Sequence, residues 1–156
     1  MPESLGRLEA KRIRKTQMDE ASQQAWLITK REIVRTDGPL FLEQSGKLLE
    51  QNAADFNEEL GLTIERGIQV QRSGHVIDIR NNGKIIVVRR IVHIVDDSIV
   101  KIATQIVFAE GKTKLTEEAL RFDVTPDGQV TLGGRNFVSF ADRMFKDISA
   151  PVGSDC

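Results

Sequence analysis

The chain has 156 residues, with 22 Lys and Arg against 23 Asp and Glu and a formal net charge of −1. A charge this close to zero gives no general attraction to nucleic acid or to an anionic membrane. The aromatic content of seven Phe, one Trp and no Tyr also argues against a surface that stacks bases or sugars. The length fits one domain with a substantial hydrophobic core.

The only cysteine is Cys156, the last residue. The sequence therefore predicts neither an intramolecular disulfide nor a metal site built from thiolates. No apolar signal segment and no run of roughly 20 apolar residues is visible. We expect a reducing, cytoplasmic setting, no membrane association, no metal and no cofactor.

Residues 1–20 are polar and locally basic, and we expect a flexible arm there, followed by one α+β domain over residues 21–150. A nucleic-acid-associated protein that uses this arm is a weaker alternative, because its cations could contact phosphates. Residues 151–156 are expected to be a disordered tail. The pattern of residues 26–35 favours a helix to about Lys30 followed by extended chain, with a strand over these residues as the alternative. The arm's cations are Arg7, Lys11, Arg12, Arg14 and Lys15.

An amphipathic helix is predicted over residues 38–60. Asp37 can act as its N-cap, and Pro39 is tolerated in a first turn because its missing N–H would have no partner there. Gly61 supplies the C-terminal stop. A second amphipathic helix is predicted over residues 135–149, where Phe and Met residues recur at helical spacing.

Between the helices the hydrophobic period changes to two, and short turn signals separate the strands. Connections of hairpin length predict a curved antiparallel meander of about six strands over residues 62–132. The resulting α+β layout resembles the cystatin-like and NTF2-like half-cones, with a helix-grip arrangement as the alternative if residues 26–35 form a strand. The expected strands cover 62–70, 75–80, 84–95, 99–109, 116–124 and 129–132.

The central strand, residues 84–95, is rich in β-branched residues and carries Arg89 and His93. A tight turn at residues 96–97 and a short loop at residues 81–83 would place its odd-numbered residues on the core side. This register aligns His75, Arg89 and Thr104 across neighbouring strands. An unpaired buried arginine costs several kcal/mol. Arg89 is therefore expected either to pair with Glu118 or to line an open pocket.

We expect a non-catalytic binding module with a pocket for a small anionic ligand on the concave face of the sheet. The candidate ligand-binding residues are His75, Arg89, His93, Thr104 and Glu118. The alternative is a lyase, isomerase or hydrolase in which His75 or His93 acts as acid or base and Arg89 orients an anionic substrate. The even-numbered face of the central strand also needs a cover. We expect that cover to be a second copy, giving a dimer through Ile86, Val88, Val92 and Ile94, or the segment around Trp26.

Overall fold

A computed structural model describes residues 4–83 and 86–149 of the chain. It consists of a long helix, a six-stranded sheet and a shorter helix, with a 3-10 turn before the first strand. The helices are α1 (Leu5–Leu60) and α2 (Phe137–Ser149). The strands are β1 (Ile68–Ser73), β2 (Val76–Asn81), β3 (Val87–Asp96), β4 (Ile99–Val107), β5 (Thr113–Val124) and β6 (Val130–Leu132).

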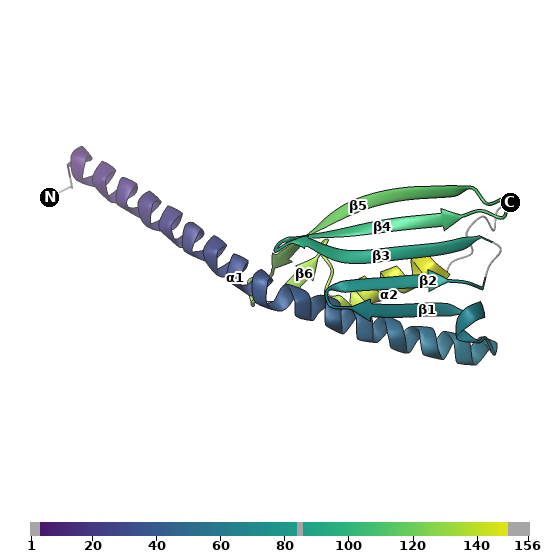
Figure 1. The fold of residues 1–156 in the computed structure, drawn as a ribbon. Coiled ribbons are helices and arrows are strands. Elements are labelled where there is room, and N and C mark those ends of the chain that lie inside the picture. Colours follow the sequence, from purple (N-terminus) through teal and green to yellow (C-terminus); the bar gives the residue numbers. More distant parts are fainter. Residues whose placement is uncertain (1–3, 84–85, 150–156) are drawn as a thin grey trace.

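The sheet is an antiparallel meander in the order β1-β2-β3-β4-β5-β6, which confirms the predicted α+β fold. Figure 1 shows the sheet arching over α2 and the C-terminal half of α1, so both helices lie on the same face. The N-terminal part of α1 projects beyond the sheet. Residues 26–35 belong to this helix, so the condition for a helix-grip arrangement is not met.

The boundaries predicted for α1 were wrong at its start and right at its end. The helix begins at Leu5, where the Ser4 side chain accepts a hydrogen bond from the Arg7 backbone N–H. It continues through Pro39 without ending. The C-cap at Gly61 is confirmed, because this glycine has the left-handed φ of 64° that favours glycine.

The helix continues past Pro39 because its neighbours are held in the core on both sides. Val34 lies buried before the proline, and Phe41 and Leu42 lie buried after it. Gly38 also lets α1 come close to the sheet, since a Cβ atom there would lie 3.2 Å from the Phe122 ring. Tertiary packing of this kind commonly outweighs a local helix-breaking signal.

The predicted register of β3 was wrong by one residue against β4. The structure pairs Ile94 with Val100 and Val92 with Ile102, and a β-bulge lies between Ile94 and Asp96. The Asp96 carboxylate closes the turn by accepting hydrogen bonds from the Ser98 and Ile99 N–H groups at 2.9 and 3.1 Å. A bulge adds one residue to one strand, and a slip of one residue exchanges the two faces.

The other two predicted hairpin registers were also wrong. Asn81 pairs with Val88, so the connection between β2 and β3 is longer than the predicted loop. Thr104 pairs with Thr116 rather than with Leu120. This second error is a shift by an even number of residues, so it moves the pairing along the strands without exchanging their faces.

The even-numbered residues of β3 therefore face the helices. Val88 and Val92 are 3% and 0% exposed and form one core with Ile77, Ile79, Val100 and Ile102. Ile94 packs against this core. Val88 and Val92, which were expected at a dimer interface, thus lie in the core of the same chain, beneath its helices. The odd-numbered face of β3 is the open one.

Candidate functional site

The five predicted ligand-binding residues do not form one site. Arg89 and His93 lie on the open outer face of the sheet, whereas Thr104 and Glu118 lie on the side of the helices. His75 is exposed in the turn between β1 and β2. The separation follows directly from the one-residue slip of β3.

Arg89 is held in an ion pair on the outer face. Its Nε and Nη2 donate hydrogen bonds to Asp78 Oδ1 and Oδ2 at 3.0 and 2.6 Å. These hydrogen bonds are the main reason that the pKa of the Arg89 guanidinium is raised above its ordinary value. The carboxylate that neutralises Arg89 is therefore Asp78, and the predicted pairing with Glu118 was wrong.

Arg90 is the arginine that the sheet turns toward the helices. Its Nη1 donates a hydrogen bond to Asp147 Oδ2 of α2 at 2.9 Å. It also lines a small pocket of about 190 Å³ together with Glu118 and Arg143. Arg89 was expected to lie under the sheet, at a pocket, with a carboxylate partner. Arg90 is the residue that does so.

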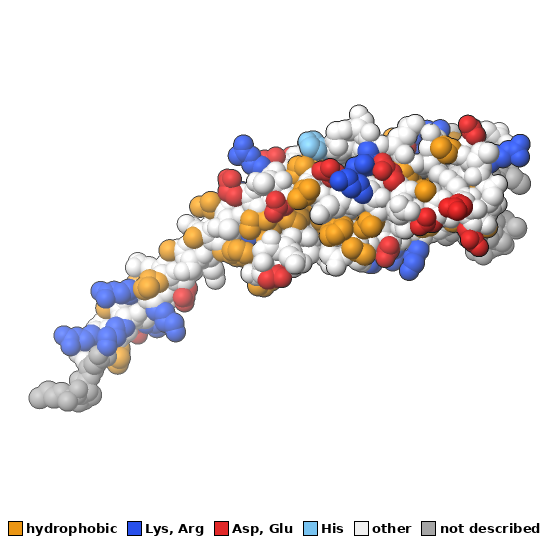
Figure 2. Space-filling view, turned by 90° about the horizontal axis from the view of Figure 1, so that it is seen from below, with side chains coloured by type: hydrophobic (Ala, Val, Ile, Leu, Met, Phe, Trp, Pro, Cys, Tyr) orange, Lys and Arg blue, Asp and Glu red, His pale blue; other side chains and the backbone are white. Residues whose placement is uncertain are grey.

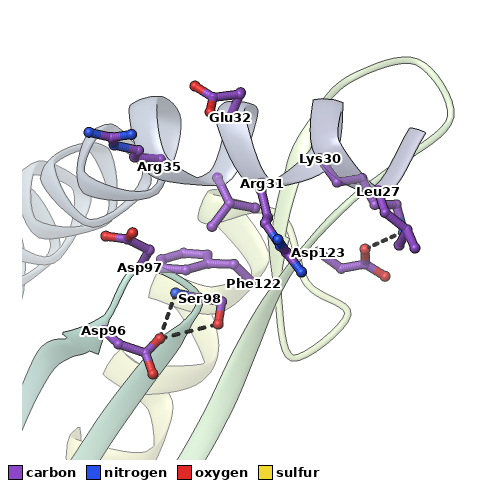
Figure 3. A pocket seen from close by; sticks show the side chains of 11 residues that line it. Leu27, Lys30, Arg31, Glu32, Arg35, Asp96, Asp97, Ser98, Phe122 and Asp123 are labelled. Carbon is purple, nitrogen blue, oxygen red and sulfur yellow. Dashed lines mark hydrogen bonds and ion pairs between the residues drawn. The ribbon is translucent and has the colours of Figure 1, made fainter. Parts of the chain in front are cut away.

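A larger pocket of about 480 Å³ lies where α1 leaves the sheet, and we call it the root pocket. Figure 3 shows that α1 forms one wall and the turn between β3 and β4 forms the other, with Phe122 between them. Leu27, Val34 and Phe122 supply its apolar surface. Its charged and polar lining consists of Lys30, Arg31, Glu32, Arg35, Asp96, Asp97, Ser98 and Asp123.

Two of the acidic groups at the root pocket are already engaged. Lys30 Nζ lies 2.8 Å from Asp123 Oδ1, and this hydrogen bond is the main cause of the lowered pKa of Asp123. The pKa of Asp96 is lowered first by the backbone N–H of Ser98, because the carboxylate closes the turn. Neither carboxylate is therefore suited to take up a proton near neutral pH.

The two arginines of the root pocket differ from Lys30, which has a carboxylate partner. Within residues 4–83 and 86–149, neither Arg31 nor Arg35 forms an ion pair. Figure 3 shows Arg31 extending from α1 toward the space between Phe122 and Asp123, while Glu32 points away from the opening. The mouth of the pocket thus offers a guanidinium next to an apolar surface.

The Lys30–Asp123 ion pair should make the stability of the folded protein depend on pH. A carboxyl group whose pKa is lowered by folding stabilises the folded state above its unfolded pKa, and this contribution is lost as the pH falls. We expect wild type to be more stable than Asp123→Asn at pH 7, and the difference to shrink below about pH 4. Urea unfolding of both proteins between pH 7 and pH 3 measures this; a difference independent of pH would contradict the assignment.

The part of α1 that projects beyond the sheet is a free-standing arm (Figure 1). Every residue from Ser4 to Thr29 is exposed. Figure 2 shows Lys and Arg side chains gathered toward its outer end, which is the basic segment noted in the sequence. The arm is thus helical rather than irregular over residues 5–29.

No helix in the described part of the chain is long and apolar enough to cross a membrane. Among the same residues, no group of three or more His, Cys, Asp or Glu side chains is arranged to hold a metal ion. Comparison with protein-family models, with curated proteins and with solved structures finds no match to this chain.

The sequence reasoning missed the root pocket because its two walls are far apart in the chain. The pocket requires residues 27–35 to be helical and the turn at residues 96–98 to lie beside them. The available signal was the cluster of cations at Lys30, Arg31 and Arg35, which have helical spacing. That signal becomes useful only when residues 26–35 are assigned to the same helix as residues 38–60.

Proposed function

We propose that this protein is a non-catalytic binding module for a small organic anion with an apolar part, and that the ligand occupies the root pocket. The observation that carries the proposal is Arg31, a guanidinium without an ion pair in the described structure, beside an apolar surface at the mouth of a 480 Å³ pocket. Ligand sites generally combine a mostly apolar lining with a few convergent polar groups.

The arginine at the pocket mouth, unpaired among the described residues, suits an anionic ligand. An arginine presents a planar set of N–H donors that matches a carboxylate, phosphate or sulfonate. Asp96 is committed to its turn, and Asp123 is neutralised by Lys30. The apolar part of the ligand would contact Leu27 and Phe122.

The module is proposed as non-catalytic because the residues that the enzyme alternative needs for proton transfer do not meet at one site. At the root pocket, Lys30 and Asp123 are engaged with each other. The enzyme alternative relied on His75 or His93 near Arg89, yet Arg89 is bound to Asp78 on the open face of the sheet. His75, Arg89 and His93 do not line the root pocket.

The anionic dye 8-anilinonaphthalene-1-sulfonate tests the proposal, because it combines a sulfonate with aromatic rings. We expect it to bind the folded protein at one site and to quench Trp26, which lies close to Lys30, with Nζ 5.8 Å from the ring centroid. We expect Arg31→Ala to weaken binding roughly 3- to 10-fold, as for the loss of one partly exposed charge-assisted hydrogen bond.

Arg14→Ala is the matched control, because Arg14 is an exposed arginine of the same helix outside the pocket. A second pair tests the apolar contact: Leu27→Glu at the pocket should weaken dye binding, whereas Leu8→Glu on the arm should leave it unchanged. Equal dye affinity for the Arg31→Ala and Arg14→Ala variants would refute the root pocket as the anion site.

A further inference from the structure

The free edge of β5 is a second surface that the proposed ligand site does not use. β6 pairs only with Phe122, Asp123 and Val124. Residues 113–121 of β5 therefore have β4 on one side, and no other strand in the described part of the chain pairs with them on the other side. All seven residues from Thr113 to Ala119 are exposed. An unpaired strand edge is a template for another strand.

The hydrogen bonds at the end of β5 show which backbone groups face outward. The Phe122 N–H donates to the Ser98 carbonyl at 2.9 Å, on the β4 side, whereas the Arg121 carbonyl accepts from the Gly133 N–H at 3.1 Å on the other side. Neighbouring residues of an antiparallel strand direct these groups to opposite edges. The odd-numbered residues of β5 thus present their N–H and carbonyl groups at the free edge.

We propose that β5 of a second copy pairs antiparallel with this edge, about a twofold axis at Thr116. This register places Leu115 opposite the partner's Glu117 and Thr113 opposite the partner's Ala119. All of these are odd-numbered residues, so their outward N–H and carbonyl groups would form about eight hydrogen bonds in the dimer. A twofold dimer is the commonest arrangement of identical chains.

Charge complementarity identifies the second copy as the occupant. Pairing about Thr116 places Lys114 directly opposite the partner's Glu118, twice by symmetry, on the side of the sheet that carries the helices. Neither Lys114 nor Glu118 has an ion pair within the described residues. Oppositely charged residues that face each other across two strands attract. The sequence around Thr116 is thus complementary to itself when read in the antiparallel direction.

The registers centred on the two glutamates that follow Thr116 are less favourable. A twofold axis at Glu117 or Glu118 would place that glutamate opposite its own copy, and like charges in this position repel. The edge also lacks two common protections against pairing, because residues 113–121 contain no proline and the β4–β5 register has no bulge. Glu117 is already paired with Lys101 at 3.4 Å on the outer face.

The dimer would place one more charge at the small pocket beneath the sheet. Glu118 lines that pocket together with Arg90. The partner's Lys114 would approach Glu118 from across the interface and neutralise it, leaving the arginines as the dominant charges there. This inference is independent of the root pocket, because none of Lys114, Thr116 and Glu118 lines it.

Sedimentation velocity of the full chain over a concentration series tests the proposal. We expect a monomer–dimer equilibrium for wild type, weakened at least 10-fold by Lys114→Glu and by Glu118→Lys. The double variant K114E/E118K should restore dimerisation, because it exchanges the two charges. A mixture of the two single variants should form a heterodimer, since one edge is then acidic and the other basic.

Hydrogen exchange gives an independent readout. The amide protons of Leu115, Glu117 and Ala119 should become protected as the concentration rises, while those of the exposed arm should not. Lys146→Glu, an exposed charge change on α2, is the control and should leave dimerisation unchanged. A wild-type chain that stays monomeric at millimolar concentration, or a dimer unaffected by all edge variants, would overturn the proposal. Dye binding at the root pocket should be the same in every edge variant.

Discussion

We expect Val92→Asp to abolish the cooperative unfolding transition, because the variant chain should already be unfolded under conditions in which wild type is folded. Val92 is 0% exposed and lies in the core between Ile77 and Ile102 of the neighbouring strands. An isolated buried carboxylate costs several kcal/mol, and the lost packing of a valine adds about 1 to 3 kcal/mol. The total free energy of unfolding of a domain of this size is only about 5–15 kcal/mol. Urea unfolding followed by circular dichroism measures the result.

Ile91→Asp is the matched control for this prediction. Ile91 is the preceding residue of β3 and faces the outer side of the sheet, opposite Asp78 and Ala103. We expect this variant to fold, with a loss of roughly 1–2 kcal/mol because Ile91 is only half-buried. Under the register expected from the sequence the two outcomes would be reversed. A folded Val92→Asp variant beside an unfolded Ile91→Asp variant would show that the faces of β3 are the other way round.

The sequence predicted five of the six strands to within three residues, but the first expected strand, residues 62–70, was wrong because a 3-10 turn occupies Ile64–Arg66 and β1 begins only at Ile68. The register of the strands was not predicted correctly. Hydrophobic alternation and the turn signals together located the meander, because both are local properties of the chain. The bulge between Ile94 and Asp96 does not appear in this alternation. It depends on the hydrogen bonds that Asp96 accepts from the Ser98 and Ile99 N–H groups. The same sequence is compatible with a two-residue turn and with a bulged turn.

The predicted start of α1 was wrong for a related reason. Asp37, Gly38 and Pro39 together have the composition of a helix start, yet they lie in the middle of a 56-residue helix. What holds the helix together there is contact with residues distant in sequence, such as Phe122, which packs against Phe41 with ring centroids 5.7 Å apart. A contact across 81 positions of the chain leaves no trace in a local pattern.

These two errors also explain why the candidate site lies elsewhere than predicted. The predicted ligand residues depended on the face of β3, and the bulge transferred the inward-facing role from Arg89 to Arg90. The root pocket depended on the continuity of α1 through residues 27–35. An arginine buried under a sheet needs a carboxylate partner whichever position of the strand it occupies. The position of that arginine required the structure.

The largest single effect of a polar residue is expected at Asn57, near the C-terminal end of α1. Asn57 is 8% exposed, and its Nδ2 donates to the Ile68 carbonyl while its Oδ1 accepts from the Ile68 N–H, both at 2.9 Å. This side chain therefore takes the place of a neighbouring strand at the start of β1. Asn57→Ala would leave two buried backbone groups without partners, each costing about 1–3 kcal/mol.

We expect Asn57→Ala to lower the free energy of unfolding by about 2–4 kcal/mol, measured by urea denaturation with the m-value compared to wild type. Gly67 would not offer a compensating contact, because it packs directly against the Asn57 amide and has no side chain. Asn52→Ala is the control, since Asn52 is a half-buried asparagine of the same helix that does not bind β1. A loss below about 0.5 kcal/mol for Asn57→Ala would mean that water replaces both hydrogen bonds, and that β1 is held to α1 by apolar packing around Ile68 alone.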